Sequence, residues 1–79
     1  MENSLKSLLE FVARSLVENP DDVVVLQTES DTSINLELHV ASGDMGKVIG
    51  KQGKIAKAIR VVVRAAAARE KKKIIVDIV

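Results

Sequence analysis

The apolar positions near the start of the chain repeat at the spacing of one helical face. Between residues 3 and 19, the apolar side chains separated by three, four or seven positions are Leu5, Leu8, Leu9, Val12 and Leu16. Asn19-Pro20 then stops the helix, because proline lacks the amide hydrogen that the next turn needs. The pattern predicts a helix from Asn3 to Asn19. Phe11 lies about 120° from this stripe, and we expect it on the flank of the buried face rather than as an exposed contact.

Two β-strands and a turn are predicted next. Residues 23–29 (VVVLQTE) are compact and β-branched, residues 30–33 (SDTS) are turn formers, and residues 34–40 (INLELHV) alternate between apolar and polar. Successive strand side chains point to opposite faces. The core side therefore takes Ile34, Leu36, Leu38 and Val40. His39 faces the other side as a solvated residue, and it has neither a cysteine nor a second histidine with which to bind a metal.

The rest of the chain predicts two helices and a third strand. Residues 41–50 (ASGDMGKVIG) predict a loop and a very short helix, with Asp44 as its N-cap and Gly50 at its end. A long helix starts after Gly53 and runs to Arg69 or Glu70, followed by a basic connector and a strand. The order helix, strand, strand, short helix, long helix, strand predicts an α+β fold, in which the helices pack on one face of a three-stranded sheet.

Composition narrows the class of protein. The 79 residues predict a single domain over residues 1–79, with a core of Val, Ile, Leu and Ala because the only aromatic residue is one Phe. The absence of cysteine excludes disulfides and fits a reducing compartment, so we expect a cytoplasmic protein. The N-terminus has no basic leader, and charged residues interrupt its apolar positions. We therefore expect neither a signal peptide nor a membrane span.

The net charge of +1 hides a strongly polarised chain. Residues 1–45 carry two basic and nine acidic side chains, whereas residues 46–73 carry ten basic side chains and one acidic. This asymmetry indicates an anionic partner for one face. A catalytic role is not predicted, because one His, no Cys and scattered carboxylates provide no pair of nucleophile and base. No cofactor or metal is predicted either.

The glycines do not match the known nucleotide-binding motifs. A P-loop needs Gly-Lys followed by Ser or Thr, but Gly53 and Lys54 precede Ile55. The dinucleotide fingerprint needs glycines spaced by two and three positions, whereas Gly46, Gly50 and Gly53 are spaced by four and three. We therefore do not expect a mononucleotide or dinucleotide site.

The segment Gly50 to Gly53 (GKQG) lies between the two predicted helices. Without β-carbons, its glycines permit a tight turn and the close approach of another chain. The free amides at the start of the second helix favour an anion, and positive charge around them comes from Lys47, Lys51 and Lys54. The segment suits a sugar-phosphate backbone. An ordinary turn between helices, with a glycine cap, is the alternative.

These residues carry a resemblance to a known family. VIGKQGKIAKAI, residues 48–59, resembles the signature of a KH domain, whose Gly-x-x-Gly loop clamps about four nucleotides of single-stranded RNA or DNA. The element order resembles the type II, prokaryotic arrangement. The run from Asp44 to Gly53 and the AIR of residues 58–60 make the chain similar to the KhpA family of small bacterial RNA-binding proteins.

The resemblance implies a set of site residues. Phosphate contacts are implied for Gly50, Lys51, Gln52 and Gly53, and Val48 and Ile49 would line an apolar groove for bases. The positive charge around them comes from Lys47, Lys54, Lys57 and Arg60. Many KH domains have a bulky aliphatic residue where this chain has Ala56, with Ile55 one place earlier, so we expect a shallower or shifted groove floor. No aromatic residue lies nearby to stack bases, so binding should be modest and salt-dependent.

The long helix has an apolar arc of about 200°, wider than burial on one side requires. A strip through Val62, Ala65 and Ala66 would admit a partner helix. The KhpA resemblance implies self-association, and pairing with a larger KH-containing RNA-binding protein.

The sequence is compatible with two functions. One is a binder of single-stranded RNA, with DNA not excluded, of the RNA chaperone or post-transcriptional regulator type. The other is a dimerisation module in which RNA contact is secondary. For Arg64, Arg69 and residues 71–73, a solvated basic face is the alternative to RNA contact.

Overall fold

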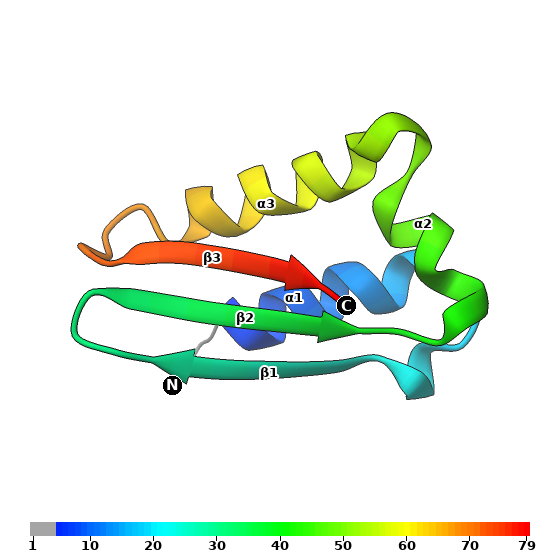
Figure 1. Cartoon of the computed structure of the whole chain (residues 1–79), viewed down its shortest axis with the longest axis horizontal. Helices are drawn as coiled ribbons and strands as arrows, with labels where there is room; N and C mark the ends of the chain where they lie inside the picture. Colours follow the sequence, from blue (N-terminus) through cyan, green and yellow to red (C-terminus); the bar gives the residue numbers. More distant parts are fainter. Residues whose placement is uncertain (1–4) are drawn as a thin grey trace.

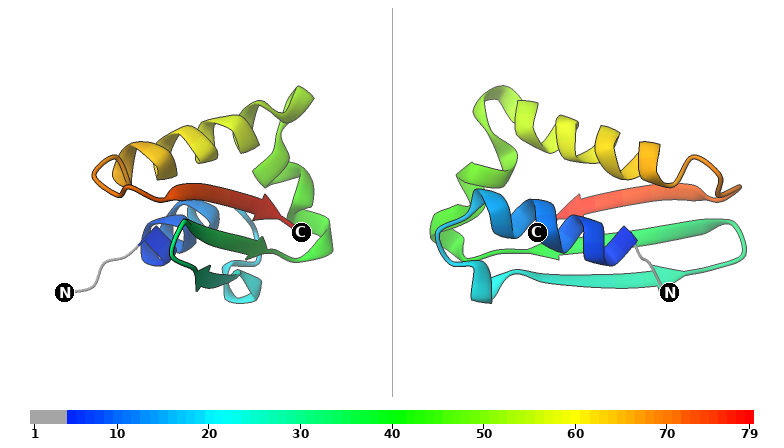
Figure 2. Two further views of the ribbon diagram at one scale, coloured as in Figure 1. Left: turned by 60° about the vertical axis from the view of Figure 1, so that its left-hand side comes forward. Right: turned by 180° about the vertical axis from the view of Figure 1, so that it is seen from behind.

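A mixed three-stranded sheet with helices on one face forms the fold. The computed structural model describes residues 5–79 (Figure 1). Its helices and strands are α1 (Leu5–Leu16), β1 (Val24–Glu29), β2 (Ser33–His39), α2 (Met45–Ile49), α3 (Lys54–Ala66) and β3 (Lys73–Ile78). The strand order is β1-β2-β3, with β1 antiparallel and β3 parallel to β2. The views in Figure 2 show α1 and α3 covering the same face of the sheet. The α+β fold and the type II KH order predicted from the sequence are confirmed.

The central strand β2 has the predicted alternation of faces. Ile34, Leu36 and Leu38 are buried, Val40 is half-buried against the core, and Asn35 is exposed. In the parallel ladder Ile34 lies beside Ile74 of β3 and Leu36 beside Val76, so the apolar positions of both strands face the helices. His39 lies on the open face, where its Nε2 is 2.9 Å from Oε1 of Glu37. The prediction of a solvated strand residue is confirmed.

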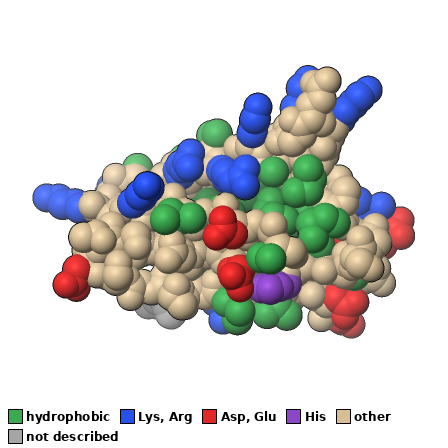
Figure 3. Space-filling model, viewed as in Figure 1, with side chains coloured by type: hydrophobic (Ala, Val, Ile, Leu, Met, Phe, Trp, Pro, Cys, Tyr) green, Lys and Arg blue, Asp and Glu red, His purple; other side chains and the backbone are tan. Residues whose placement is uncertain are grey.

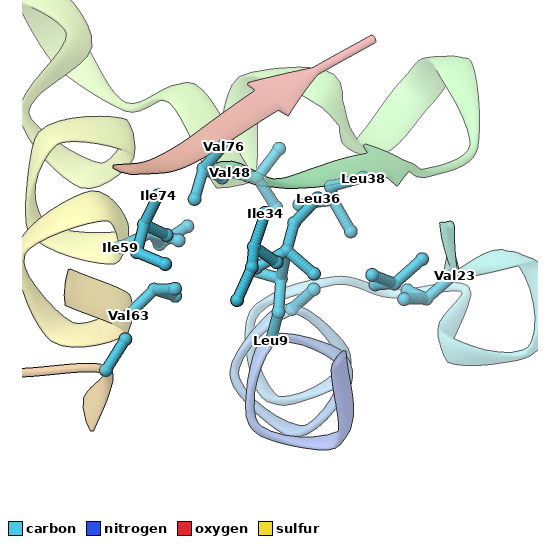
Figure 4. Packing of buried hydrophobic residues seen from close by; sticks show 13 residues of the cluster. Leu9, Val23, Ile34, Leu36, Leu38, Val48, Ile59, Val63, Ile74 and Val76 are labelled. Atoms are coloured by element: carbon cyan, nitrogen blue, oxygen red, sulfur yellow. The ribbon is translucent and has the colours of Figure 1, made fainter. Parts of the chain in front are cut away.

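The core is aliphatic and lies between the sheet and the helices. Figure 4 shows Leu9 of α1 and the pair Ile59 and Val63 of α3 pointing toward the inward-facing residues of β2 and β3. Burying one such side chain contributes about 1.5–3 kcal/mol, so this layer supplies the main stabilisation of a small fold. The predicted core of Val, Ile, Leu and Ala is confirmed for the described residues.

Both long helices are shorter than predicted. Asn3 lies outside the described residues, and α1 ends at Leu16 rather than at Asn19. Helix α3 ends at Ala66 rather than at residue 69 or 70. Its last turn tightens, because the amide of Ala67 donates to the carbonyls of both Val63 and Arg64. The run of alanines after residue 64 favours a helix, so the local sequence does not predict that α3 ends at Ala66.

Phe11 is exposed, and the prediction that it flanks the buried face is wrong. Its side chain is 70% exposed, while Leu9 and Ala13 of the same helix have no exposed surface. Phe11 lies two positions from each of them, about 200° around the helix. The buried face of α1 is therefore centred on Leu9 and Ala13, opposite Phe11.

Asp44 occupies the predicted N-cap position of the short helix α2, but its side chain does not cap the helix amides as the sequence predicted. It makes no capping hydrogen bond to α2, and its carboxylate is 1% exposed. Oδ1 accepts a hydrogen bond from the amide of Glu18 at 3.1 Å, and Oδ2 accepts from the amide and from Nδ2 of Asn19, both at 3.0 Å. The amides of Glu18 and Asn19 lie beyond the end of α1 at Leu16, and the carboxylate supplies the acceptors that these two backbone donors need. Asp44 therefore ties the end of α1 to the start of α2.

The environment of Asp44 favours its charged form. Burial alone would raise the pKa of this carboxyl group, but the hydrogen bonds from Glu18 and Asn19, together with the charge of Lys47, outweigh it and hold the pKa below its ordinary value. A lowered folded-state pKa stabilises the fold at pH values above the unfolded-state pKa. That stabilisation is lost as the pH falls through the folded-state pKa.

We expect Asp44→Asn to lower the Tm by several degrees at pH 7, because a neutral amide cannot accept three hydrogen bonds as the carboxylate does. The difference from the wild type should stay constant above about pH 4 and shrink at lower pH. Thermal melts followed by circular dichroism between pH 2.5 and 8 measure both effects. Asp31→Asn, in the exposed hairpin turn, is the matched control. Equal melts of wild type and Asp44→Asn at pH 7 would contradict this role.

Candidate nucleic-acid interface

The segment Gly50 to Gly53 forms a tight turn that projects from the body of the molecule, where α2 meets α3 (Figure 1). The amide of Gly50 donates to the carbonyl of Gly46 at 2.9 Å and ends α2, as the sequence predicted. Gln52 (φ 59°) and Gly53 (φ 75°) both have left-handed backbone conformations. Such a conformation is uncommon for a residue with a side chain, so the turn is held by its surroundings.

The two glycines of the turn are required for different reasons. Gly50 has φ 77°, and a β-carbon added there would lie 2.5 Å from Cγ1 of Ile55. Gly53 also has positive φ, but an added β-carbon would meet nothing within 4 Å. Ile55 therefore packs closely against the turn, whereas its neighbour Ala56 is buried in the protein. Ile55 therefore has a structural role. It stands one place before Ala56, the position at which many KH domains have a bulky aliphatic residue.

The turn leaves backbone donors available for an anion. Lys51 and Gln52 are the first residues of the tight helical turn Lys51–Gly53, and the first amides of a helical turn have no partner within it; both side chains are exposed. Lys54 is the first residue of α3 and is exposed too. These two amides, the positive end of a helix and two lysines are together suited to bind a phosphate group.

The other basic residues of the predicted site differ in their surroundings. Lys57 is exposed on α3. Nζ of Lys47 lies 3.8 Å from Oε2 of Glu18, in an exposed pair that is worth little. Arg60 is half-buried, and its Nε donates to the carbonyl of Val76 at 3.2 Å. Arg60 therefore fastens α3 to the free edge of β3, a role that the sequence did not indicate.

The two apolar residues before the turn lie in different places. Val48 has no exposed surface and belongs to the core, so it does not offer the groove surface that the sequence predicted. The short helix α2 must bury one of its few side chains to pack on the body of the protein, and Val48 is that side chain. Ile49 is half-buried and keeps part of its surface exposed. The sequence Val48-Ile49 does not indicate which of the two side chains is buried.

Helix α3 has three distinct sides. Ile59 and Val63 face the core, while Lys57 lies on the side that Arg60 holds against β3. The third side is apolar and open, and Val62 on it is 44% exposed. The three sides follow from the rotation of about 100° per residue along a helix. Ala65 and Ala66, predicted with Val62 as a partner strip, are also exposed.

A shallow apolar hollow lies between α3 and α1. Its volume is about 290 Å³, and its lining comes from Val12, Leu16, Lys54, Ile55, Ala58, Ile59 and Val62. The sequence placed Val12 and Leu16 in the core stripe of α1, whereas Leu16 is 37% exposed. The hollow is open because small residues of α3, such as Ala58, do not reach across to α1.

Charge is distributed unevenly over the face that includes the turn. Figure 3 shows basic side chains in a row along the upper edge, from the projecting turn over α3 toward the opposite end, with acidic side chains below them. The sequence already predicted this separation from the excess of basic residues after residue 45. Among residues 5–79, no group of three or more His, Cys, Asp or Glu residues could hold a metal ion, and none of the helices could cross a membrane.

Comparisons with known proteins find similar proteins over nearly the whole chain. The family model for the KH domain of KhpA/KhpB matches residues 6–78. The RNA-binding protein KhpA of Clostridium acetobutylicum is 57% identical over 75 residues, which cover 95% of this chain and 100% of the relative. Proteins of the same name from Caldanaerobacter subterraneus and Listeria monocytogenes are 56% and 45% identical, over 91% and 95% of this chain and 96% and 99% of their own lengths. No solved structure matches the chain significantly.

We expect Gly50→Ala to lower the free energy of unfolding by about 2–4 kcal/mol, from left-handed strain and from the clash with Ile55. Gly53→Ala should cost about 1–2 kcal/mol, because it adds strain without a clash. Urea unfolding measures both, and the double variant Gly50→Ala/Ile55→Ala isolates the clash. Its loss should be smaller than the sum of the single losses. Equal losses for Gly50→Ala and Gly53→Ala would show that Ile55 does not constrain the turn.

Proposed function

The chain belongs to the KhpA/KhpB family of KH domains, and from this premise we propose that it binds single-stranded RNA by clamping the backbone at the turn from Gly50 to Gly53. The family is noncatalytic, and the chain is not an enzyme. The observation that carries the proposal is the combination of two amides at the start of a helical turn, those of Lys51 and Gln52, with the positive end of α3.

In the proposed complex, the turn holds phosphates and the adjoining surface receives bases. A phosphate accepts hydrogen bonds from the amides of Lys51 and Gln52, and the Lys51 and Lys54 side chains balance its charge. The exposed part of Ile49 borders the surface on which bases lie. No aromatic residue lies between residues 46 and 60, so stacking worth about 1–3 kcal/mol per base is not available there. Binding is therefore modest, salt-dependent and weakly specific for sequence.

These properties fit an RNA chaperone or a post-transcriptional regulator that contacts many RNAs reversibly. Such a protein would act in the cytoplasm as a single KH domain over residues 1–79. The same phosphate contacts would hold single-stranded DNA, because they do not involve the 2′-hydroxyl group.

The second candidate function is pairing with another protein through the open side of α3. The exposed strip of Val62, Ala65 and Ala66, beside the hollow that α1 and α3 share, supports it. The partner would be a second copy of the chain or a larger KH-containing RNA-binding protein. RNA and protein would then occupy different sides of α3, so the two functions are compatible.

We expect Lys51→Asp/Gln52→Asp to weaken binding to a mixed single-stranded RNA pool by about tenfold or more at 50 mM salt, because it places repulsive charge at the phosphate site. Aspartate tolerates the left-handed conformation at position 52, so the fold should persist, and circular dichroism checks this. Fluorescence anisotropy at low and moderate salt measures the affinity.

The control for this experiment is Lys6→Asp/Gln27→Glu, which makes the same change in net charge at exposed positions of α1 and β1. This control should bind RNA nearly as the wild type does. Equal binding by the wild type and Lys51→Asp/Gln52→Asp would refute the proposed site.

Sedimentation velocity tests the proposed pairing. We expect the wild type to self-associate at tens of micromolar and Val62→Asp to sediment as a monomer, because the charge would be desolvated in the interface. Val61→Asp is the matched control: Val61 is 63% exposed on the same helix but points about 100° away from Val62. A wild type that stays monomeric, or equal effects of the two variants, would remove the basis for self-pairing through this strip.

A further inference from the structure

The row of basic side chains continues well beyond the proposed phosphate site. Arg64 near the end of α3, Lys71 in the connector and Lys73 at the start of β3 are all exposed. No ion pair among residues 5–79 involves any of them. The intervening Lys72 differs, because its Nζ lies 2.6 Å from Oε2 of Glu29. These residues belong to the end of α3, the connector and the start of β3, which lie at the end of the molecule opposite the turn (Figure 1). Figure 3 shows a row of basic side chains that continues toward that end.

The geometry of α3 aligns these cations with the turn. Lys57 and Arg64 are seven residues apart, which is nearly two full helical turns, so they point in almost the same direction. Between them, Arg60 is bonded to the carbonyl of Val76 and keeps this side of the helix beside the edge of β3. The connector then brings Lys71 back toward that edge, where β3 begins. Two acidic residues lie nearby, Glu70 and Asp77, and they leave the row basic overall.

We propose that single-stranded RNA held at the turn continues along this side of α3 to the connector, where Arg64, Lys71 and Lys73 contact further phosphates. The inference deepens the proposed function and rests on it. Helix α3 has 13 residues, which corresponds to about 20 Å. At about 3.4 Å per stacked nucleotide, that length accommodates about six nucleotides beyond those at the turn. The footprint would thus be about ten nucleotides rather than four.

The salt dependence of binding tests this path. Affinity alone would not, because a longer RNA can bind one site in several positions and gains affinity from that number. This statistical gain does not depend on salt. The probes are oligouridylates of 4 and 12 nucleotides, measured by fluorescence anisotropy between 25 and 200 mM salt. Each phosphate contact on a single strand contributes about −0.7 to the slope of log K against log salt. Three additional contacts should make the slope for the 12-mer steeper than that for the 4-mer by about 2. Equal slopes for the two RNAs would overturn the proposal.

Two double variants locate the additional contacts. Arg64→Gln/Lys71→Gln should reduce the slope for the 12-mer by about 1.4. The control Lys6→Gln/Arg14→Gln removes the same charge from α1 and should leave that slope unchanged. Equal effects of the two variants would show that only net charge matters and would overturn the path. A failure of the proposed phosphate site at the turn would look different from a failure of the extended path. In that case Lys51→Asp/Gln52→Asp would bind the 4-mer as tightly as the wild type does, whatever the difference between the slopes for the 4-mer and the 12-mer.

Discussion

The tight turn at Gly50 is the constraint on which the rest of the candidate site depends. Ile55 fills the space where a side chain at position 50 would lie, and the positive φ there excludes most other residues as well. The turn therefore fixes the direction in which α3 leaves α2 and leaves the amides of Lys51 and Gln52 without a partner within the turn. At the other end of α2, the buried carboxylate of Asp44 holds this short helix to α1. A helix of five residues is too short to be stable by itself, so these two attachments position it.

Helix α3 then divides its surface among three tasks. One side completes the core, a second carries the cations beside β3, and the third forms an apolar hollow with α1. The buried residues Ile59 and Val63 orient the helix, and the bond from Arg60 to the carbonyl of Val76 holds its basic side beside the edge of the sheet. An RNA on the basic side would leave the apolar side open. Protein pairing and RNA binding can therefore be combined in a small chain.

The sequence was enough to predict the element order, the inward face of β2 and the position of the turn. These features follow from local patterns: alternation in the strand, and glycines between two helical segments. Predictions from the sequence were wrong where contacts between residues far apart in the chain determine the structure. Asp44 looked like a helix cap, but its partners lie about 25 residues earlier in the chain. Val48 and Ile49 are chemically alike, and only packing assigns Val48 to the core. The early end of α3 depends on the return of the chain to β3, which the alanine run does not encode.

The central claim is that RNA meets this chain at the amides of the turn, and nuclear magnetic resonance can observe those amides directly. A 15N-labelled sample would be titrated with a short oligouridylate while the backbone amide signals are followed. The amides of Lys51, Gln52 and Gly53 should show the largest shifts, with little change at Phe11 or along β1. Large shifts confined to α1 and the open side of α3, with an unaffected turn, would contradict the account.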